Sequence, residues 1–282
     1  MPDIIMHINY FERGYTLDTL FDKAKFYGYD GVELRGTREG LTPAKYMAQV
    51  KKQMARTGLA VTMACPCNLN NPKADERAAE VAKATDLLGR ASAIGVRLFN
   101  TMAGPLTVPG IPYTEFDKHG SGAATWEQWA WAVEGFRQLG SVAEELGVRM
   151  AFETHNGYLH DLAKPTAELL KRIDSPAIGA NLDMGNIVLN KNGEALTEAL
   201  AVLGDKVYYN HLKNILKPSV GGYIVCGLAD GIIDNRVWAQ TLKDNGNDSP
   251  ICLEAPRQGD RDLFAQEDIA YFRRVLEDIG WA

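Results

Sequence analysis

The 282-residue sequence has no long apolar run, and its N-terminus, MPDIIMHINYFERG, has no basic start followed by an apolar core. A membrane-spanning helix needs about 18 consecutive apolar residues, and no segment approaches that length. The sequence also lacks a basic run, and its 30 basic and 36 acidic residues give a net charge of −6. Because phosphate-backbone binding depends on clustered lysine and arginine, we predict no nucleic-acid partner, no membrane partner and a cytoplasmic location.

Cysteines are few and poorly spaced for a disulfide framework or a zinc site. Only Cys65 and Cys67 of the four lie close together, and a lone C-x-C pair lacks the second pair that structural zinc sites use. We expect reduced thiols that fill space beside a pocket, and Cys65 is a candidate substrate contact. No low-complexity tract or polar linker divides the chain, which predicts a single domain over residues 1–282.

Short apolar or β-branched runs alternate regularly with stretches of helical period. The predicted strands are residues 4–10, 31–36, 60–66, 96–102, 148–154, 178–183, 207–213 and 250–255. The predicted helices are residues 17–28, 43–57, 74–94, 125–146, 164–174, 193–204, 235–245 and 262–279. Eight such units with short helix-to-strand turns predict an α/β fold, a (β/α)8 TIM barrel. A doubly wound sheet is disfavoured because no glycine-rich phosphate turn follows the first strand.

Two of the predicted loops are long. Loops that follow strands in such folds usually have about 2–6 residues, and longer ones are often lids or binding loops. Residues 103–124 are therefore predicted to form a lid-like loop, and residues 216–234 a loop over the barrel mouth.

Catalytic groups of a TIM barrel gather at the carboxyl ends of its strands. Four acidic or imidazole side chains close four successive predicted strands, the fifth to the eighth: Glu153, Asp183, His211 and Glu254. Three carboxylates with one imidazole form a mainly hard-oxygen set, which suits Mn²⁺, Mg²⁺ or Co²⁺ better than Zn²⁺. The four residues predict a site for one divalent metal ion, and the alternative is four unrelated polar strand ends.

Other polar residues accompany these four. His155 and Lys213 stand two residues after Glu153 and His211, so each pair is predicted to share one face of a strand. We expect catalytic roles for both: His155 contacts a substrate hydroxyl, orients a ligand or acts as a base, and Lys213 stabilises oxyanion charge. The candidate substrate-binding residues are Asn186, Arg257, Asn100, Cys65 and Glu33. For each of these residues the alternative is a structural role, such as an ion pair at the barrel rim.

Six motifs occur in a specific order: YDGVELRG (29–36), FETHNG (152–157), PTAELLKRIDSPAIGANLDMGN (165–186), YYNHLKN (208–214), GLADGIID (227–234) and ICLEA (251–255). Together they resemble the xylose-isomerase-like barrels, which include sugar-phosphate isomerases and epimerases, ketose 3-epimerases, hydroxypyruvate isomerases and inosose-processing enzymes. The resemblance implies that Glu153, Asp183, His211 and Glu254 are the metal ligands and that the two glutamates also transfer protons. Related AP endonucleases have a histidine three residues after the aspartate, where this chain has Asn186, which argues for one metal and against phosphodiester cleavage.

The resemblance implies a metal-dependent sugar isomerase or epimerase that removes a proton beside a metal-bound carbonyl and passes through an enediolate. Return of the proton on the same side gives isomerisation, and return on the opposite face gives epimerisation. The main alternative is a lyase, similar to 3-dehydroshikimate dehydratase or eliminating a group β to the ketone of a 3-keto sugar. An endonuclease and a sugar-binding barrel without turnover are further alternatives. A small sugar or keto-sugar substrate and a homodimer or homotetramer are also implied.

Overall fold

The strands of the chain are arranged as a closed parallel barrel. The computed structural model describes residues 1–11, 14–220, 222–255 and 257–281. Eight strands have the neighbour order β1-β10-β7-β6-β5-β4-β3-β2 of a closed barrel, and β8 and β9 form a separate two-stranded sheet. The predicted (β/α)8 fold is confirmed. The chain forms two compact units, Met1–Thr62 with Tyr209–Ala282 and Met63–Tyr208, and β3 (Ala60–Ala64) and β7 (Val207–Leu212) each run from one unit into the other.

The first unit joins the two ends of the chain. Strand β1 pairs in parallel with both β2 and β10, and β10 pairs with β7. The further elements of this unit are β1 (Ile4–His7), η1 (Ile8–Tyr10), α1 (Leu17–Tyr27), β2 (Gly31–Arg35), α2 (Pro43–Thr57), β8 (Asn214–Leu216), β9 (Ile224–Cys226), α8 (Asn235–Asp244), β10 (Ile251–Leu253) and α9 (Arg261–Asp278). Its core includes Trp238 of α8, whose ring lies 6.3 Å from that of Phe272 in α9. Burial of such large apolar side chains is the main force that stabilises a fold of this kind.

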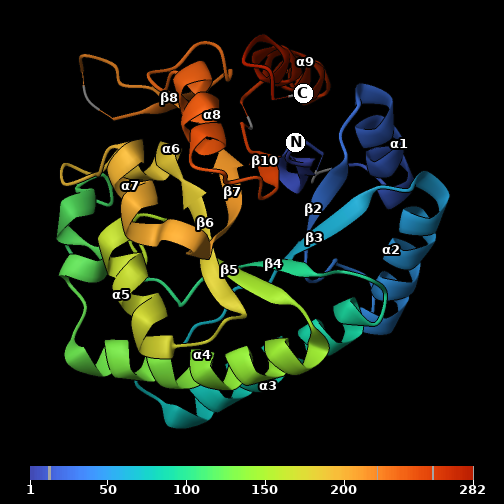
Figure 1. Cartoon of the computed structure of the whole chain (residues 1–282). Helices are drawn as coiled ribbons and strands as arrows, with labels where there is room; N and C mark the ends of the chain where they lie inside the picture. The colour runs from blue at the N-terminus through green and yellow to red at the C-terminus, as the bar shows by residue number, and fades with distance from the viewer. Residues whose placement is uncertain (12–13, 221, 256, 282) are drawn as a thin grey trace. The chain divides into compact units, whose positions relative to one another are not determined.

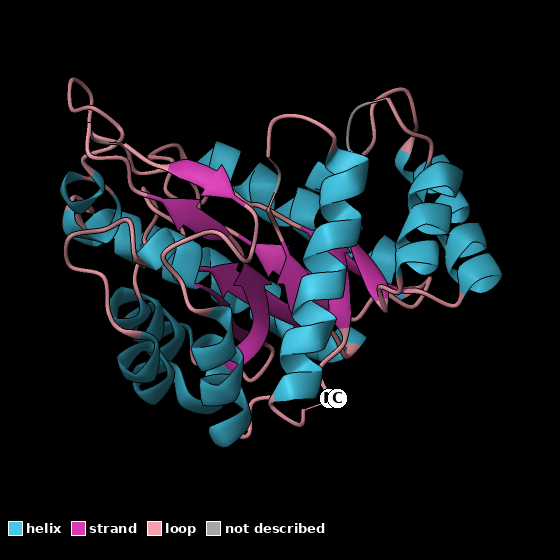
Figure 2. Cartoon of the chain, turned by 90° about the horizontal axis from the view of Figure 1, so that it is seen from above, coloured by secondary structure: helices cyan, strands magenta, loops and turns pink. Residues whose placement is uncertain are grey.

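The second unit holds the middle of the chain, where β5 pairs in parallel with β4 and β6. Its further elements are α3 (Ala74–Ser92), β4 (Leu98–Thr101), η2 (Phe116–Lys118), η3 (Gly120–Gly122), α4 (Trp126–Leu146), β5 (Arg149–Glu153), α5 (Ala163–Ile173), β6 (Ile178–Asp183), α6 (Met184–Ile187), α7 (Leu196–Leu203) and η4 (Gly204–Lys206). Helices α3 and α4 lie side by side outside the strands (Figure 1). In Figure 2 the helices are drawn in cyan and the strands in magenta.

Local signals place the strand that carries Glu153. Thr125 caps α4 by accepting a hydrogen bond from the backbone N–H of Gln128, whose side chain bonds back to the N–H of Thr125. The helix ends at Gly147, which has a φ of 62° and whose N–H bonds to Ala143 and Glu144. The chain therefore reverses within two residues and enters β5, and Phe152 packs its ring 4.5 Å from Phe136 of α4.

Several element boundaries differ from the predictions, and these differences affect the candidate site. The strand predicted over 4–10 ends at His7, because residues 8–10 form a short 3-10 helix. Strands β5, β7 and β10 end one or two residues early, at Glu153, Leu212 and Leu253. The short helix α6 and the β8–β9 hairpin were not predicted.

The long loop 103–124 is bonded to the loop that follows β5. Tyr113 donates its hydroxyl to the backbone oxygen of Asn156 at 2.9 Å, and the N–H of Leu106 donates to the oxygen of Gly157 at 2.6 Å. The N–H of Ser121 donates to the carboxylate of Asp161 at 3.0 Å. The loop is therefore anchored by backbone and side-chain hydrogen bonds, and its role as a lid stays a prediction.

Two expectations about composition are tested by the structure. All four cysteines are buried and unpaired, as the spacing predicts. Among the described residues, no helix combines the length and the apolar character that a membrane span requires.

Candidate active site

The carboxyl ends of β5 and β6 bring two acidic side chains into one buried region of the second unit. Glu153 is the last residue of β5 and Asp183 the last of β6, and both are buried. Thr154 ties the two strand ends together: its hydroxyl accepts the N–H of Asp183 at 2.8 Å and donates to the Asp183 backbone oxygen at 3.2 Å. Asp183 also caps α6 by accepting the N–H of Asn186 at 3.1 Å.

Two asparagine side chains hold the Glu153 carboxylate. The amide of Asn186 donates to Oε1 at 3.1 Å, and the amide of Asn100 donates to Oε2 at 3.0 Å. Asn186 also donates to Oδ2 of Asp183 at 3.0 Å, and Asn181 supports Asn100 at 3.1 Å. Each oxygen of Glu153 thus accepts an N–H, an arrangement that suits an ionised carboxylate. The predicted residues Asn100 and Asn186 lie beside the catalytic glutamate candidate, and their contact with substrate stays a prediction.

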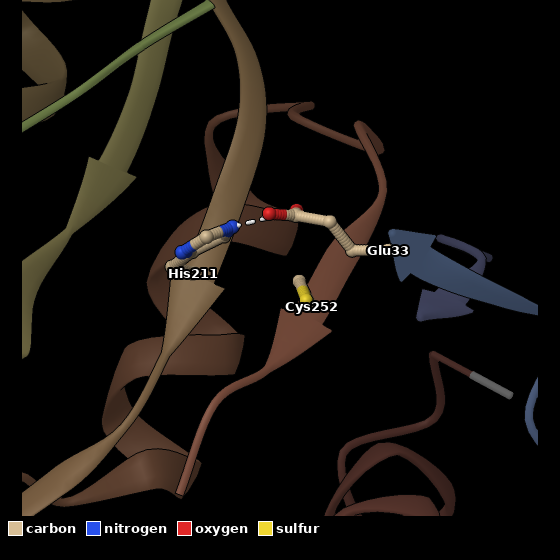
Figure 3. A group of neighbouring side chains, drawn as sticks. All are labelled: Glu33, His211 and Cys252. Atoms are coloured by element: carbon tan, nitrogen blue, oxygen red, sulfur yellow. Dashed lines mark hydrogen bonds and ion pairs between the residues drawn. The ribbon is translucent and has the colours of Figure 1, made fainter. Parts of the chain in front are cut away.

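The first unit carries a second group of polar side chains, centred on His211 of β7. Its Nε2 lies 3.0 Å from Oε2 of Glu33, and its Nδ1 lies 3.1 Å from Oε2 of Glu254. Figure 3 shows Glu33 of β2 and His211 pointing toward one another, with Cys252 of β10 beside them. Glu33 also accepts the hydroxyl of Tyr209 at 2.7 Å. Burial raises the pKa of Glu33, but the imidazoles of His211 and His7 outweigh it and hold that pKa well below its usual range.

Glu254, just after β10, is partly buried among further donors. Lys213 Nζ lies 3.3 Å from Oε2, and the amide of Asn9 donates to Oε1 at 3.2 Å. Burial raises the pKa of Glu254, but Lys213, His7 and His211 together hold it well below its usual range, so the carboxylate is ionised. The structure therefore brings Lys213 to one of the two candidate proton-transfer glutamates.

The spacing argument for His155 and Lys213 extends past the strands, because β5 ends at Glu153 and β7 at Leu212. Lys213 and His211 nevertheless contact the same oxygen of Glu254, Oε2. His155 instead lies in the turn after β5, with Nδ1 2.9 Å from the backbone oxygen of Asn156. The catalytic roles of His155 and Lys213 stay predictions.

Two other predicted residues have structural partners. Arg257 donates to Asp268 at 2.7 Å, and its guanidinium lies 4.1 Å from the centre of the Phe264 ring. Cys65 is buried, and contact with Cys67 together with burial raises the pKa of its thiol well above its usual range. An anion contact for Arg257 and a substrate contact for Cys65 stay predictions.

Sequence reasoning missed His7. It ends β1 directly beside Glu33 of β2, with Nε2 3.5 Å from Oε1 of Glu33, and its Nδ1 accepts the N–H of Asn9. Its position at a strand end was hidden because the first strand was predicted to run to Tyr10.

His160 was missed as well. Its Nε2 accepts the N–H of Ala103 at 3.1 Å, so its Nδ1 carries the proton and donates to the backbone oxygen of Glu153. Burial lowers the pKa of His160 to about 4, and the ring is therefore neutral. Nothing in the spacing FETHNGYLHD distinguishes His160 from a surface histidine.

A family model described as xylose isomerase-like TIM barrel matches residues 21–275. The chain belongs to this xylose isomerase-like TIM barrel family. The resemblance drawn from the six motifs is confirmed. Inosose dehydratases from two strains of Clostridium perfringens are 27% identical to this chain over 145 residues, which is 46% of this chain and 48% of each relative. The chain thus spans about half the length of the curated relatives it matches.

Two solved structures resemble nearly the whole chain in fold. D-psicose 3-epimerase from Clostridium cellulolyticum H10, crystallised with D-tagatose, has a TM-score of 0.79 at 19% identity and covers 97% of this chain and 99% of its own. A xylose isomerase-like TIM barrel protein from Mycobacterium smegmatis in complex with magnesium has a TM-score of 0.75 at 19% identity, covering 100% and 98%. At these identities the likeness shows the fold alone.

Residues of the types that bind divalent cations occur in both units of this xylose isomerase-like barrel. Glu153 and Asp183 are buried carboxylates that share one neutral amide donor, and such paired negative charges favour a nearby cation. In the other unit, Glu33, His211 and Cys252 each offer a ligand atom within 4.8 Å of the others. Burial raises the pKa of the Cys252 thiol to about 12.

Proposed function

We propose that the chain is a divalent-metal-dependent enzyme that transfers a proton at the carbon beside a sugar carbonyl, as a sugar isomerase or epimerase. The proposed ligands are Glu153, Asp183, His211 and Glu254, a set of three carboxylates and one imidazole. This set favours Mn²⁺, Mg²⁺ or Co²⁺ over Zn²⁺. The observation that carries the proposal is the pair Glu153 and Asp183, buried and bridged by the Asn186 amide, on a fold whose strand ends ordinarily hold catalytic groups.

The side chains of this family member have distinct tasks in the proposed reaction. A divalent ion would supply a Lewis acid that polarises the sugar carbonyl, an effect worth several kcal/mol. Glu153, whose two oxygens each accept an amide N–H, is positioned to accept the proton. Glu254, beside Lys213, is suited to carry the second proton transfer. If one carboxylate removes the proton and the other returns it to the opposite face, the configuration at the carbon is inverted, which is epimerisation. If one carboxylate does both, the carbonyl moves to the neighbouring carbon, which is isomerisation.

Deuterium exchange tests the proposal. The chain is incubated in D₂O with Mn²⁺ and a panel of ketoses and hydroxy-aldehydes, and the recovered sugars are analysed by NMR. We expect deuterium at the carbon beside the carbonyl, loss of exchange after chelation and recovery when Mn²⁺ is returned. Glu153→Gln keeps the side-chain volume and removes the base, so it should lower exchange by at least about 100-fold. Full turnover in the chelated protein would refute the proposal.

A lyase is the second candidate, and the match to inosose dehydratases favours it. Dehydration begins with the same proton removal and then expels a group β to the ketone. With inososes and 3-keto sugars as substrates, a lyase produces an enone absorbance in the ultraviolet. An isomerase or epimerase instead returns labelled sugar without that absorbance, so one set of incubations distinguishes the two.

The remaining proposals concern the context of the protein. Sugar-processing structural neighbours support a small sugar or keto-sugar substrate. We keep the single domain over residues 1–282, a homodimer or homotetramer, and a cytoplasmic location as proposals. Light scattering coupled to gel filtration would measure the oligomeric state.

A further inference from the structure

The carboxylate of Glu33 and the ring of Tyr209 both contact His211 in the first unit. We propose that Glu33 is a positioning residue for His211: it accepts a hydrogen bond from Nε2 and so leaves Nδ1 as the nitrogen that binds the metal. This inference rests on the proposed function, which makes His211 a ligand. We propose this positioning role for Glu33 in place of the substrate-binding role expected from the sequence.

Three strands build this arrangement. Tyr209 and His211 are two residues apart in β7 and so point to the same side of the strand, toward Glu33 of β2. Oε2 of Glu33 accepts both the Tyr209 hydroxyl at 2.7 Å and His211 Nε2 at 3.0 Å. Thr62 lies 3.0 Å from the Tyr209 hydroxyl and extends the chain of hydrogen bonds inward.

Glu33 and His211 are both buried, which restricts the partners available to each. Glu33 is 1% exposed, and the His211 side chain is fully buried. A buried ionised carboxylate is destabilising unless several donors satisfy it, and Glu33 has Tyr209, His211 and, 3.5 Å from its other oxygen, His7. Glu33 is shielded from solvent, so orienting the neighbouring imidazole of His211 explains its position better than contact with a dissolved substrate does.

The hydrogen bond decides which nitrogen of His211 is available. Oε2 of Glu33 already accepts the Tyr209 hydroxyl, so it also acts as the acceptor toward Nε2, which therefore carries the proton. Nδ1 then faces Glu254, the other proposed ligand of this unit, at 3.1 Å. The rings of Tyr209 and His7 meet the imidazole edge to face, 5.1 and 5.6 Å away, and limit its rotation. Carboxylates that orient metal-binding histidines in this way typically contribute about 10–100-fold to metal affinity.

A different role for the same residues would be a second cation site made by Glu33, His211 and Cys252. Cys252 lies directly beside His211 in the strand pairing of β10 with β7. Oε2 of Glu33 already accepts two donors, Tyr209 and His211, so the positioning role is favoured. Metal stoichiometry separates the two roles.

The test measures Mn²⁺ binding by the loss of the electron paramagnetic resonance signal of free Mn²⁺. Glu33→Gln keeps the volume but lets the amide donate to Nε2, which favours the opposite tautomer. We expect its dissociation constant to rise about 10–100-fold. Tyr209→Phe should raise it less, by a few-fold, because Glu33 remains. Glu194→Gln is the matched control, because Glu194 is a buried glutamate whose carboxylate accepts the backbone N–H groups of Ala163 and Lys164. This variant and Cys252→Ser should bind Mn²⁺ like the wild type.

A second readout identifies the nitrogen directly. Nitrogen-15 NMR of histidine-labelled protein loaded with diamagnetic Mg²⁺ should show His211 protonated at Nε2, with the protonated nitrogen changed in Glu33→Gln. If the wild type binds no metal, the proposed function fails. If it binds one Mn²⁺ per chain and Glu33→Gln binds equally well, only the positioning role is overturned.

Two further outcomes are decisive. Should Glu33→Gln not fold, Tyr209→Phe with unchanged affinity and an Nδ1-protonated His211 overturns the inference. Two Mn²⁺ ions per wild-type chain, reduced to one in Cys252→Ser, would show a second cation site in place of a positioning residue.

Discussion

Asn186 donates one side-chain amide to two carboxylates, Oε1 of Glu153 at 3.1 Å and Oδ2 of Asp183 at 3.0 Å. The contact exists because Asp183 ends β6 and caps α6, which places Asn186 three residues later beside both acids. A neutral donor at this point orients the two side chains without cancelling their charge. Asn186 is thus placed to position the proposed metal ligands.

Asn186→Ala should weaken Mn²⁺ binding by about 10-fold or more, because both carboxylates lose a donor that fixes their orientation. At saturating Mn²⁺, kcat should fall while KM for the sugar changes little. Titration with Mn²⁺ and steady-state kinetics measure the two effects. A raised KM with unchanged metal affinity would show that Asn186 contacts the substrate instead.

Gly120→Ala should destabilise the loop 103–124 more than Gly110→Ala. Both glycines have a positive φ, 62° and 82°, so each substitution introduces backbone strain of about 1–3 kcal/mol. A Cβ at Gly110 meets open space, whereas one at Gly120 would meet the Asp161 carboxylate and lie 2.7 Å from the backbone oxygen of Tyr158. Urea unfolding measures the difference, and equal losses for the two variants would contradict the packing seen around Gly120.

Asp161 should make stability depend on pH. Burial raises its pKa to about 6, from an ordinary value of 3.8, although the N–H of Ser121 and its hydroxyl oppose the rise. The folded state therefore binds this proton more tightly than the unfolded state. The resulting stability is fully present below about pH 3.8 and is lost as the pH rises through about 6.

The variant Asp161→Asn isolates that contribution, because it cannot ionise and still offers an oxygen to Ser121. Between pH 4 and pH 7.5 the wild type should lose up to about 3 kcal/mol of unfolding free energy relative to the variant. Chemical denaturation at a series of pH values gives both curves. Parallel curves would mean that Asp161 titrates normally in the folded protein.

The barrel architecture could be predicted because its eight strands and the helices between them have local sequence signals, unlike α6 and the β8–β9 hairpin. Strand β6 was predicted with its observed bounds, 178–183, and α2 with its bounds 43–57, where Thr42 and Pro43 begin the helix and the chain turns at Gly58. Apolar runs and helix caps are local properties, so short stretches of sequence suffice to find them.

Partners across strands could not be predicted in the same way. His7 was not recognised as a strand end because the first strand was predicted to continue to Tyr10. Ile8 and Tyr10 are residue types that favour strands, yet residues 8–10 form a 3-10 helix. His160 accepts a hydrogen bond from Ala103, and Tyr209 donates one to Glu33, and in each pair the two residues are far apart in the chain. Such pairings depend on the register of the barrel, which the spacing of polar residues does not specify.

The most direct test of the central claim is the number of divalent ions that one chain binds. Purified protein is stripped with chelator, titrated with Mn²⁺ and analysed by elemental mass spectrometry and by paramagnetic resonance. The account predicts one ion per chain, with binding lost when Glu153, Asp183, His211 or Glu254 is changed singly to alanine and retained in Glu194→Gln. A stoichiometry of zero, or full binding by the four alanine variants, would contradict it.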